Sequence, residues 1–161
     1  MSQDLCVKME EGILNIRVGA IIMKGNQFLM VGNDSFDHLY SVGGRIKFGE
    51  TAEEAVIREV YEETGAKMEI DRLGFVHENF FPGDSEVKKG KVVHEISFFF
   101  YMKVPEDFKP VSNSFTDDGN PEYLKWITVD EPQIFYPEFF RTELKNPSDI
   151  VKHFVTKDVK L

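Results

Sequence analysis

Runs of apolar residues along the first part of the chain predict strands separated by turns. Residues 13–23 are mostly apolar and rich in β-branched side chains, Gly25-Asn26 follows, and apolar residues resume at 27–31. Glycine and asparagine adopt the backbone conformations that tight turns need, so this pattern predicts a β-hairpin. A polar loop then leads to a short extended segment at 39–42.

The second half of the chain predicts a larger sheet. Segments 67–80 and 92–104 are long strand candidates, and the turn-rich loop between them indicates antiparallel pairing. Both faces of the second segment carry apolar or aromatic side chains, which places it at the centre of a sheet. The pattern also predicts a strand at 122–128, a helix at 137–145 and a last extended segment at 150–156.

One helix interrupts these strands. Thr51 and Glu54 have the spacing of a capping box, in which each side chain binds the backbone amide of the other residue. Gly65 suits the left-handed conformation that ends many helices. The helix is therefore expected to begin near Thr51 and to stop at Gly65.

Acidic side chains lie on the inward face of this helix. At about 100° per residue, Val56 and Val60 define an apolar stripe, and Glu59 and Glu63 fall inside it, with Glu62 at its edge. An unpaired carboxylate in a protein interior shifts its pKa or costs several kcal/mol. A compensating cation is therefore expected beside these glutamates.

The opposite face of the helix is polar. Arg58 is expected there, with Glu54 and Glu62 as its i,i+4 neighbours. Solvation alone explains Glu53 and Glu54, so these two carboxylates need no cation.

The donor set and the preceding loop both suit phosphate chemistry. Three carboxylates within one turn match a hard divalent cation, and Mg²⁺ keeps coordination sites for substrate and water. Gly43 and Gly44 let backbone approach a ligand closely, and free N–H groups at a helix N-terminus favour an anion. Arg45, and Arg17 on the first strand, are candidate phosphate contacts, with ordinary surface ion pairs as the alternative.

Composition limits the remaining possibilities. At 161 residues, 42% of them hydrophobic, the chain is expected to form a single domain over 1–161. Its formal net charge of −9 argues against binding to a nucleic acid polymer, which needs clustered Lys and Arg. A single cysteine, Cys6, and the lack of a leader-like or membrane-spanning apolar run predict a cytoplasmic protein that is not embedded in a membrane.

Two dipeptides on the long strands, His77-Glu78 and His94-Glu95, do not extend to the His-Glu-x-x-His zinc motif, because residues 81 and 98 are phenylalanine. The two dipeptides can face each other across the antiparallel pair, which leaves a substrate-binding or packing role open for them.

The segment from Gly44 to Ala66 resembles the box of the Nudix hydrolases, the MutT-like family. The family pattern is Gly, five residues, Glu, seven residues, Arg-Glu, an aliphatic residue, any residue, Glu-Glu, any residue, Gly and an aliphatic residue. Ala66 is smaller than the usual final aliphatic residue. The other positions are filled at the required spacing by Gly44, Glu50, Arg58, Glu59, Val60, Glu62, Glu63 and Gly65.

The resemblance implies an α+β fold, the Nudix α/β/α sandwich with a central mixed β-sheet flanked by helices. It also implies hydrolysis of the diphosphate linkage between a nucleoside diphosphate and a second group X. In that reading Glu59, Glu62 and Glu63 bind Mg²⁺ or Mn²⁺, helped by the Gly43 carbonyl. Glu50 supports the metal's surroundings, and Arg58 orients the glutamates.

The proton acceptor and the substrate are less defined by the resemblance. The acceptor is Glu59 or a carboxylate from a later loop, for which Asp118 and Glu122 are the candidates and solvated loop charges the alternative. The small-molecule substrate is a (deoxy)nucleoside triphosphate, or ADP-ribose or a nucleotide sugar. A non-catalytic Nudix-fold module that senses a nucleotide is the alternative of another class, and a homodimer is left open.

Overall fold

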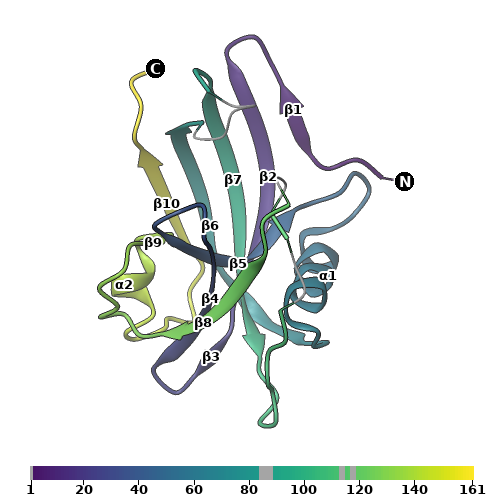
Figure 1. The fold of residues 1–161 in the computed structure, drawn as a ribbon, viewed down its shortest axis with the longest axis vertical. Coiled ribbons are helices and arrows are strands. Elements are labelled where there is room, and N and C mark those ends of the chain that lie inside the picture. Colours follow the sequence, from purple (N-terminus) through teal and green to yellow (C-terminus); the bar gives the residue numbers. More distant parts are fainter. Residues whose placement is uncertain (1, 84–88, 113–114, 117–118) are drawn as a thin grey trace.

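The computed structural model describes residues 2–83, 89–112, 115–116 and 119–161. Strands make up most of the regular secondary structure, with one long and one short helix (Figure 1). The helices are α1 (Ala52–Thr64) and α2 (Phe140–Glu143). The strands are β1 (Cys6–Lys8), β2 (Gly12–Ile21), β3 (Met23–Lys24), β4 (Gln27–Asn33), β5 (Leu39–Arg45), β6 (Glu69–Pro82), β7 (Val92–Lys103), β8 (Glu122–Ile127), β9 (Phe135–Tyr136) and β10 (Lys152–Lys157).

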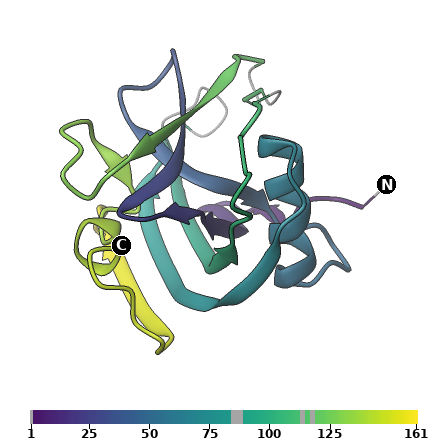
Figure 2. The same cartoon turned by 90° about the horizontal axis from the view of Figure 1, so that it is seen from below.

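The strands form one mixed sheet in the order β10-β6-β7-β2-β5-β4-β3, with β1, β8 and β9 paired to β2, β4 and β5. The central strand β2 runs parallel to β7 and antiparallel to β5. Seen from below, the sheet curves between α1 on one side and α2 on the other (Figure 2). The predicted α+β fold, a mixed sheet flanked by helices, is confirmed.

Each face of the sheet has its own apolar core. The helix α1 contributes Val56 and Val60 to a cluster that also contains Val18 of β2. The other face buries a cluster of aromatic rings, including Phe28 and Phe140. Because both faces are covered, most residues of β2 and β4 are buried, as expected for the interior of a sheet.

The predicted ends of the long helix are confirmed. The Thr51 side chain accepts a hydrogen bond from the Glu54 amide at 3.1 Å, and the Glu54 carboxylate accepts one from the Thr51 amide at 2.8 Å. Gly65 ends the helix with a φ of 76°, in the left-handed region that favours glycine. These local contacts fix where α1 begins and therefore where its carboxylates lie.

Two local predictions need correction. The turn at Gly25-Asn26 joins β4 only to the two-residue β3, while β2 diverges to pair with β5, β7 and β1. The predicted helix at 137–145 contains only the four residues of α2, flanked by turns. In both places the partner strands or core contacts, which are distant in sequence, override the local pattern.

The long strands β6 and β7 pair antiparallel as predicted, but their histidines do not face each other. His94 lies opposite Phe80, on which its ring stacks at a centroid distance of 4.2 Å, and His77 lies opposite Ser97. The two His-Glu dipeptides therefore form no joint site. Of the helices in the described part of the chain, neither is long and apolar enough to cross a membrane.

Candidate active site

The Gly-Gly pair that was predicted in a loop before α1 lies at the end of strand β5, and a Cβ at either position would meet a close neighbour. Gly43 has a φ of 150°, and a Cβ on it would lie 2.1 Å from the Val18 carbonyl oxygen of the neighbouring strand. A Cβ on Gly44 would lie 2.5 Å from Cδ of Glu59. The second glycine therefore leaves room for a carboxylate of α1.

Glu63 is the most deeply buried carboxylate of the helix. Its residue is only 7% exposed, and its Oε2 accepts a hydrogen bond from the Gly43 amide at 3.1 Å. Burial raises the pKa of the Glu63 carboxyl well above the ordinary value of 4.5, and the nearby negative charges of Glu59 and Glu122 raise it further. The inward position predicted for Glu63 is confirmed.

Glu59 lies beside it on the same face. Burial raises the pKa of the Glu59 carboxyl, even though its hydrogen bond to Arg58 acts in the opposite direction. Glu62, by contrast, has a side chain that is 51% exposed and pairs with Arg58 at 3.3 Å. The helix thus carries two enclosed carboxylates and one at the rim.

Arg58 does not lie on the solvated face that the helical pattern predicts for it, because it reaches back to the loop before the helix. Its Nε and Nη2 donate to the two oxygens of Glu50 at 2.7 and 3.0 Å, and Nη2 also donates to the Arg45 carbonyl. Its Nη1 donates to Glu59 at 2.6 Å. This bidentate pairing lowers the pKa of the Glu50 carboxyl and raises that of the guanidinium. Of the two predicted i,i+4 pairs, only that with Glu62 is formed.

A second carboxylate network lies close to Glu63. Glu122, the first residue of β8, accepts a hydrogen bond from the Tyr40 hydroxyl, which in turn accepts one from Asn33 Nδ2 at 3.0 Å. Burial, followed by the hydrogen bond to Glu122, raises the pKa of Tyr40, so its hydroxyl stays protonated at neutral pH. Tyr40 lies on β5, the strand that also carries Gly43, so Glu122 and Glu63 are both hydrogen-bonded to residues of the same strand.

The sequence did not single out Tyr40 or Asn33. The only available signal was an asparagine at the end of the apolar run 28–32, where a strand would be expected to continue with apolar residues. Of the two later carboxylates predicted from the sequence, Glu122 is hydrogen-bonded to β5, the strand whose Gly43 amide donates to Glu63, and Asp118 lies outside the described residues.

The two arginines predicted to contact phosphate lie opposite one another on β2 and β5. Arg17 lies 4.0 Å from Glu95, and its positive charge lowers the pKa of both Glu59 and Glu63. Arg45 lies 3.6 Å from Asp4. Arg17 is therefore within electrostatic range of the buried carboxylates. Both arginines also make ion pairs, which were the predicted alternative to phosphate contacts.

The acidic residues do not converge into a ready metal cage. Among the residues that the structure describes, no group of three or more His, Cys, Asp or Glu side chains could hold a metal ion as placed. The donor chemistry nevertheless fits a hard divalent cation, because Glu59 and Glu63 supply carboxylate oxygens. Glu63 is buried, and Glu59 lies in the space left by the missing side chain at Gly44. Arg58 is the cation that pairs with Glu59 in this arrangement.

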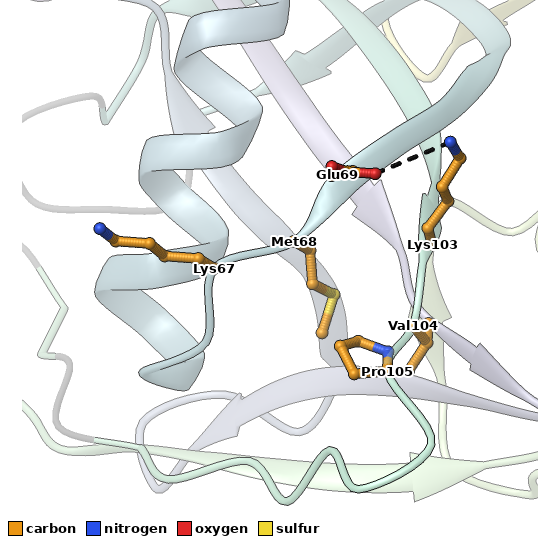
Figure 3. A pocket seen from close by; sticks show the side chains of 6 residues that line it. All are labelled: Lys67, Met68, Glu69, Lys103, Val104 and Pro105. Carbon is orange, nitrogen blue, oxygen red and sulfur yellow. Dashed lines mark ion pairs between the residues drawn. The ribbon is translucent and has the colours of Figure 1, made fainter.

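Two cavities lie near the helix. One cavity, of about 520 Å³, is lined by residues of the segment between β5 and α1, including Lys47, Phe48 and Glu50, and by Arg58 of α1. The other, of about 270 Å³, is lined by Lys67, Met68, Glu69, Lys103, Val104 and Pro105, with a Glu69–Lys103 ion pair of 3.8 Å along its rim (Figure 3). None of the residues lining the second cavity belongs to the predicted site.

A set of helix glutamates that packs against a preceding Gly-Gly pair in this way defines the Nudix class of hydrolases. The NUDIX domain profile matches residues 14–146, and the chain belongs to this family. The prediction of a Nudix pyrophosphohydrolase, acting on acid anhydrides of phosphorus, is thereby confirmed at the level of the family.

Solved structures share the fold. A UDP-X diphosphatase superposes with a TM-score of 0.59 at 16% identity, over 87% of this chain and 66% of that one. An ADP-ribose pyrophosphatase from Streptococcus suis 89-1591 gives 0.56 at 16% identity, over 88% and 98%. A MutT NUDIX hydrolase from Burkholderia pseudomallei gives 0.57 at 19% identity, over 84% and 98%. At these identities the likeness concerns the fold.

Proposed function

We propose that this protein hydrolyses the diphosphate linkage of a nucleoside diphosphate joined to a second group X, with a (deoxy)nucleoside triphosphate as the first substrate to test. The observation that carries the proposal is the pair of enclosed carboxylates, Glu59 and Glu63, beside Gly43-Gly44. Burying two negative charges side by side is unfavourable, and the raised pKa of both groups expresses that cost. A divalent cation offsets it and at the same time binds phosphate.

Glu59, Glu62 and Glu63, with the Gly43 carbonyl, would hold Mg²⁺ or Mn²⁺. When bound, such a cation lowers the pKa of a water molecule and neutralises charge on the phosphate oxygens. The exposed position of Glu62 suits a ligand at the rim of the site, where substrate enters. Arg58 fixes Glu50 through two hydrogen bonds and thereby ties the loop to the helix, which supports a positioning role for both residues.

A carboxylate must accept the proton of the attacking water. Glu122 and Glu59 are the two described candidates, and Glu122 lies close enough to Glu63 for its charge to raise that residue's pKa. Arg17 and Arg45, opposite each other on β2 and β5, are the proposed phosphate contacts, together with the backbone of Gly44. Arg17 is the better supported, because its charge acts on Glu59 and Glu63.

Two alternatives remain specific enough to test. The structures named as UDP-X diphosphatase and ADP-ribose pyrophosphatase favour a nucleotide sugar or ADP-ribose as the substrate. A non-catalytic nucleotide sensor is disfavoured because it has no need for Glu59, Glu62, Glu63 and Arg58 together, all of which are present.

The test is a substrate panel. The protein is incubated with Mg²⁺ and separately with nucleoside triphosphates, nucleotide sugars, ADP-ribose and dinucleoside polyphosphates, and the released phosphate, pyrophosphate and nucleoside monophosphate are measured. Turnover that is lost in Glu63→Gln but kept in Glu53→Gln, a change on the exposed face of the same helix, supports the proposal. Binding of a nucleotide without turnover of any member of the panel would establish the sensor instead.

A further inference from the structure

We propose that Asn33 and Tyr40 are positioning residues that hold the Glu122 carboxylate in one orientation through a chain of hydrogen bonds that runs in one direction. This inference rests on the function proposed above, and in particular on a role for Glu122 at the reaction site. The chain begins at the backbone of the loop after β4 and ends on a carboxylate that lies 82 positions after Tyr40 in sequence.

Asn33 sets the direction. Asn33 is buried, with 2% of its surface exposed. Its Oδ1 accepts hydrogen bonds from the backbone amides of Ser35 at 2.8 Å and Phe36 at 3.2 Å. A backbone amide can only donate, so the atom that faces it must be the carboxamide oxygen. The other end of the carboxamide, Nδ2, is thereby fixed as a donor.

Tyr40 passes this direction on. Asn33 Nδ2 donates to the Tyr40 hydroxyl oxygen at 3.0 Å, and a hydroxyl has only one hydrogen to donate in turn. The Tyr40 hydroxyl donates that hydrogen to Oε2 of Glu122. Asn33 Nδ2 cannot accept a hydrogen bond from the Tyr40 hydroxyl. The Tyr40 hydroxyl therefore donates its hydrogen to the Glu122 carboxylate.

The strand register keeps the three residues in place. Asn33 lies directly opposite Glu122 in the β4–β8 pair, and Tyr40 lies opposite Val31 in the β4–β5 pair. One oxygen of Glu122 accepts the hydrogen bond from Tyr40, and Tyr40 lies on β5 together with Gly43, whose amide donates to Glu63. A carboxylate held at one oxygen presents the other in a fixed direction, which suits a proton acceptor or a ligand at the rim of a cation site.

Reversing the direction of the chain gives a sharp test. Asn33→Asp keeps an oxygen for the Ser35 and Phe36 amides but replaces the Nδ2 donor by a second acceptor. The Tyr40 hydroxyl is then expected to donate its hydrogen bond to residue 33 instead of Glu122. Tyr40→Phe removes the hydroxyl and keeps the ring. We expect each change to lower kcat about tenfold with KM unchanged, the size expected for one hydrogen bond to a charged group.

Non-additivity separates positioning from a general structural effect. In Tyr40→Phe, the further change Asn33→Asp is expected to have no additional effect on kcat, and neither change is expected to lower kcat further in Glu122→Gln. Tyr136→Phe is the matched control, because Tyr136 is a half-exposed tyrosine on the neighbouring strand β9 and has no part in the chain. It is expected to keep wild-type kcat.

A second readout does not depend on turnover. Titration with Mn²⁺, followed by electron paramagnetic resonance, is expected to give a dissociation constant raised about threefold by Tyr40→Phe, because a Glu122 carboxylate that is no longer held contributes less negative charge to the site. If the wild-type protein turns over substrate but both variants keep its kcat, and Tyr40→Phe also keeps its Mn²⁺ affinity, the inference is wrong and the proposed function stands. If nothing is turned over, the function fails, and the Mn²⁺ titration still decides whether the chain orients Glu122.

Discussion

The carboxylate of Glu59 occupies the space that a side chain at position 44 would fill. A Cβ on Gly44 would lie 2.5 Å from Cδ and Oε1 of Glu59, closer than atoms in contact can approach. The observed position of the Glu59 carboxylate therefore depends on the lack of a side chain at position 44, which lies 15 residues earlier in the sequence. This contact gives a physical reason why the glycine at the end of β5 and the helix glutamate occur in the same motif.

Gly44→Ala is accordingly expected to expel Glu59 from its position. The protein must either shift the β5 backbone or move the carboxylate toward solvent, and both outcomes remove an oxygen ligand from the enclosed site. We expect kcat to fall at least tenfold and the Mn²⁺ dissociation constant to rise by a similar factor. An alanine variant with wild-type kcat and Mn²⁺ affinity would show that the contact has no functional role.

The stability of the metal-free protein should depend on Glu63 and on pH. A carboxyl whose pKa is raised on folding stabilises the protein fully below its ordinary value of 4.5, and this contribution is lost as the pH rises toward the raised pKa. We therefore expect Glu63→Gln to raise the free energy of unfolding at pH 7 by about 1–2 kcal/mol without metal, and to have little effect at pH 4. Urea unfolding at the two pH values measures the difference.

Magnesium should reverse the ranking of these two proteins. Bound cation stabilises only the wild type, so adding millimolar Mg²⁺ is expected to raise the unfolding midpoint of the wild type and to leave Glu63→Gln unchanged. Equal stabilisation of both proteins by Mg²⁺ would mean that Glu63 is not a ligand.

Arg58 should resist replacement by another cation. Its guanidinium donates to both oxygens of Glu50 and to the Arg45 carbonyl, a fork that lysine cannot reproduce. We expect Arg58→Lys to lower the free energy of unfolding by about 1–3 kcal/mol. The control is Lys103→Met, which breaks the exposed pair with Glu69 and should cost less than about 0.5 kcal/mol.

Local signals in the sequence were sufficient to place α1. Its capping box, its C-terminal glycine and the inward position of Glu59 and Glu63 all depend on residues within one short segment. The Nudix box could be recognised for the same reason, since its residues have fixed spacing along the chain. The prediction that Arg58 lies on the solvated face was wrong because its partner, Glu50, precedes the helix. Helical periodicity says nothing about contacts with residues outside the helix.

The rest of the site depends on strand register. Asn33, Tyr40 and Glu122 come from three strands, and only the pairing of β4 with both β5 and β8 brings them together. The same pairing explains why the predicted hairpin is shorter than expected: only Met23–Lys24 pairs with β4 across the turn, and most of β4 pairs with β8 and β5. Such long-range contacts leave no periodic signal in a single sequence.

His77 should make the protein sensitive to mild acid. Burial lowers the pKa of its ring from 6.5 to about 4, and the charge of His153 acts in the same direction. A histidine with a lowered pKa contributes stability above pH 6.5 that is lost as the pH falls toward 4, up to about 3 kcal/mol. We expect unfolding free energies to decline over this range in the wild type.

His77→Gln keeps a polar group that can reach Thr156, to which the His77 ring is hydrogen-bonded at 2.9 Å, and it cannot take up a proton. Its unfolding free energy should decline less between pH 6.5 and 4. An identical decline in both proteins would assign the acid sensitivity to other groups.

The central claim is that the enclosed glutamates of α1 bind a divalent cation, and direct titration with Mn²⁺ tests it without any choice of substrate. Electron paramagnetic resonance reports free Mn²⁺ in the presence of the wild type, Glu59→Gln, Glu63→Gln and the exposed control Glu53→Gln. We predict binding by the wild type and the control, with affinity lowered at least tenfold in the other two. Equal affinity in all four proteins would contradict the account.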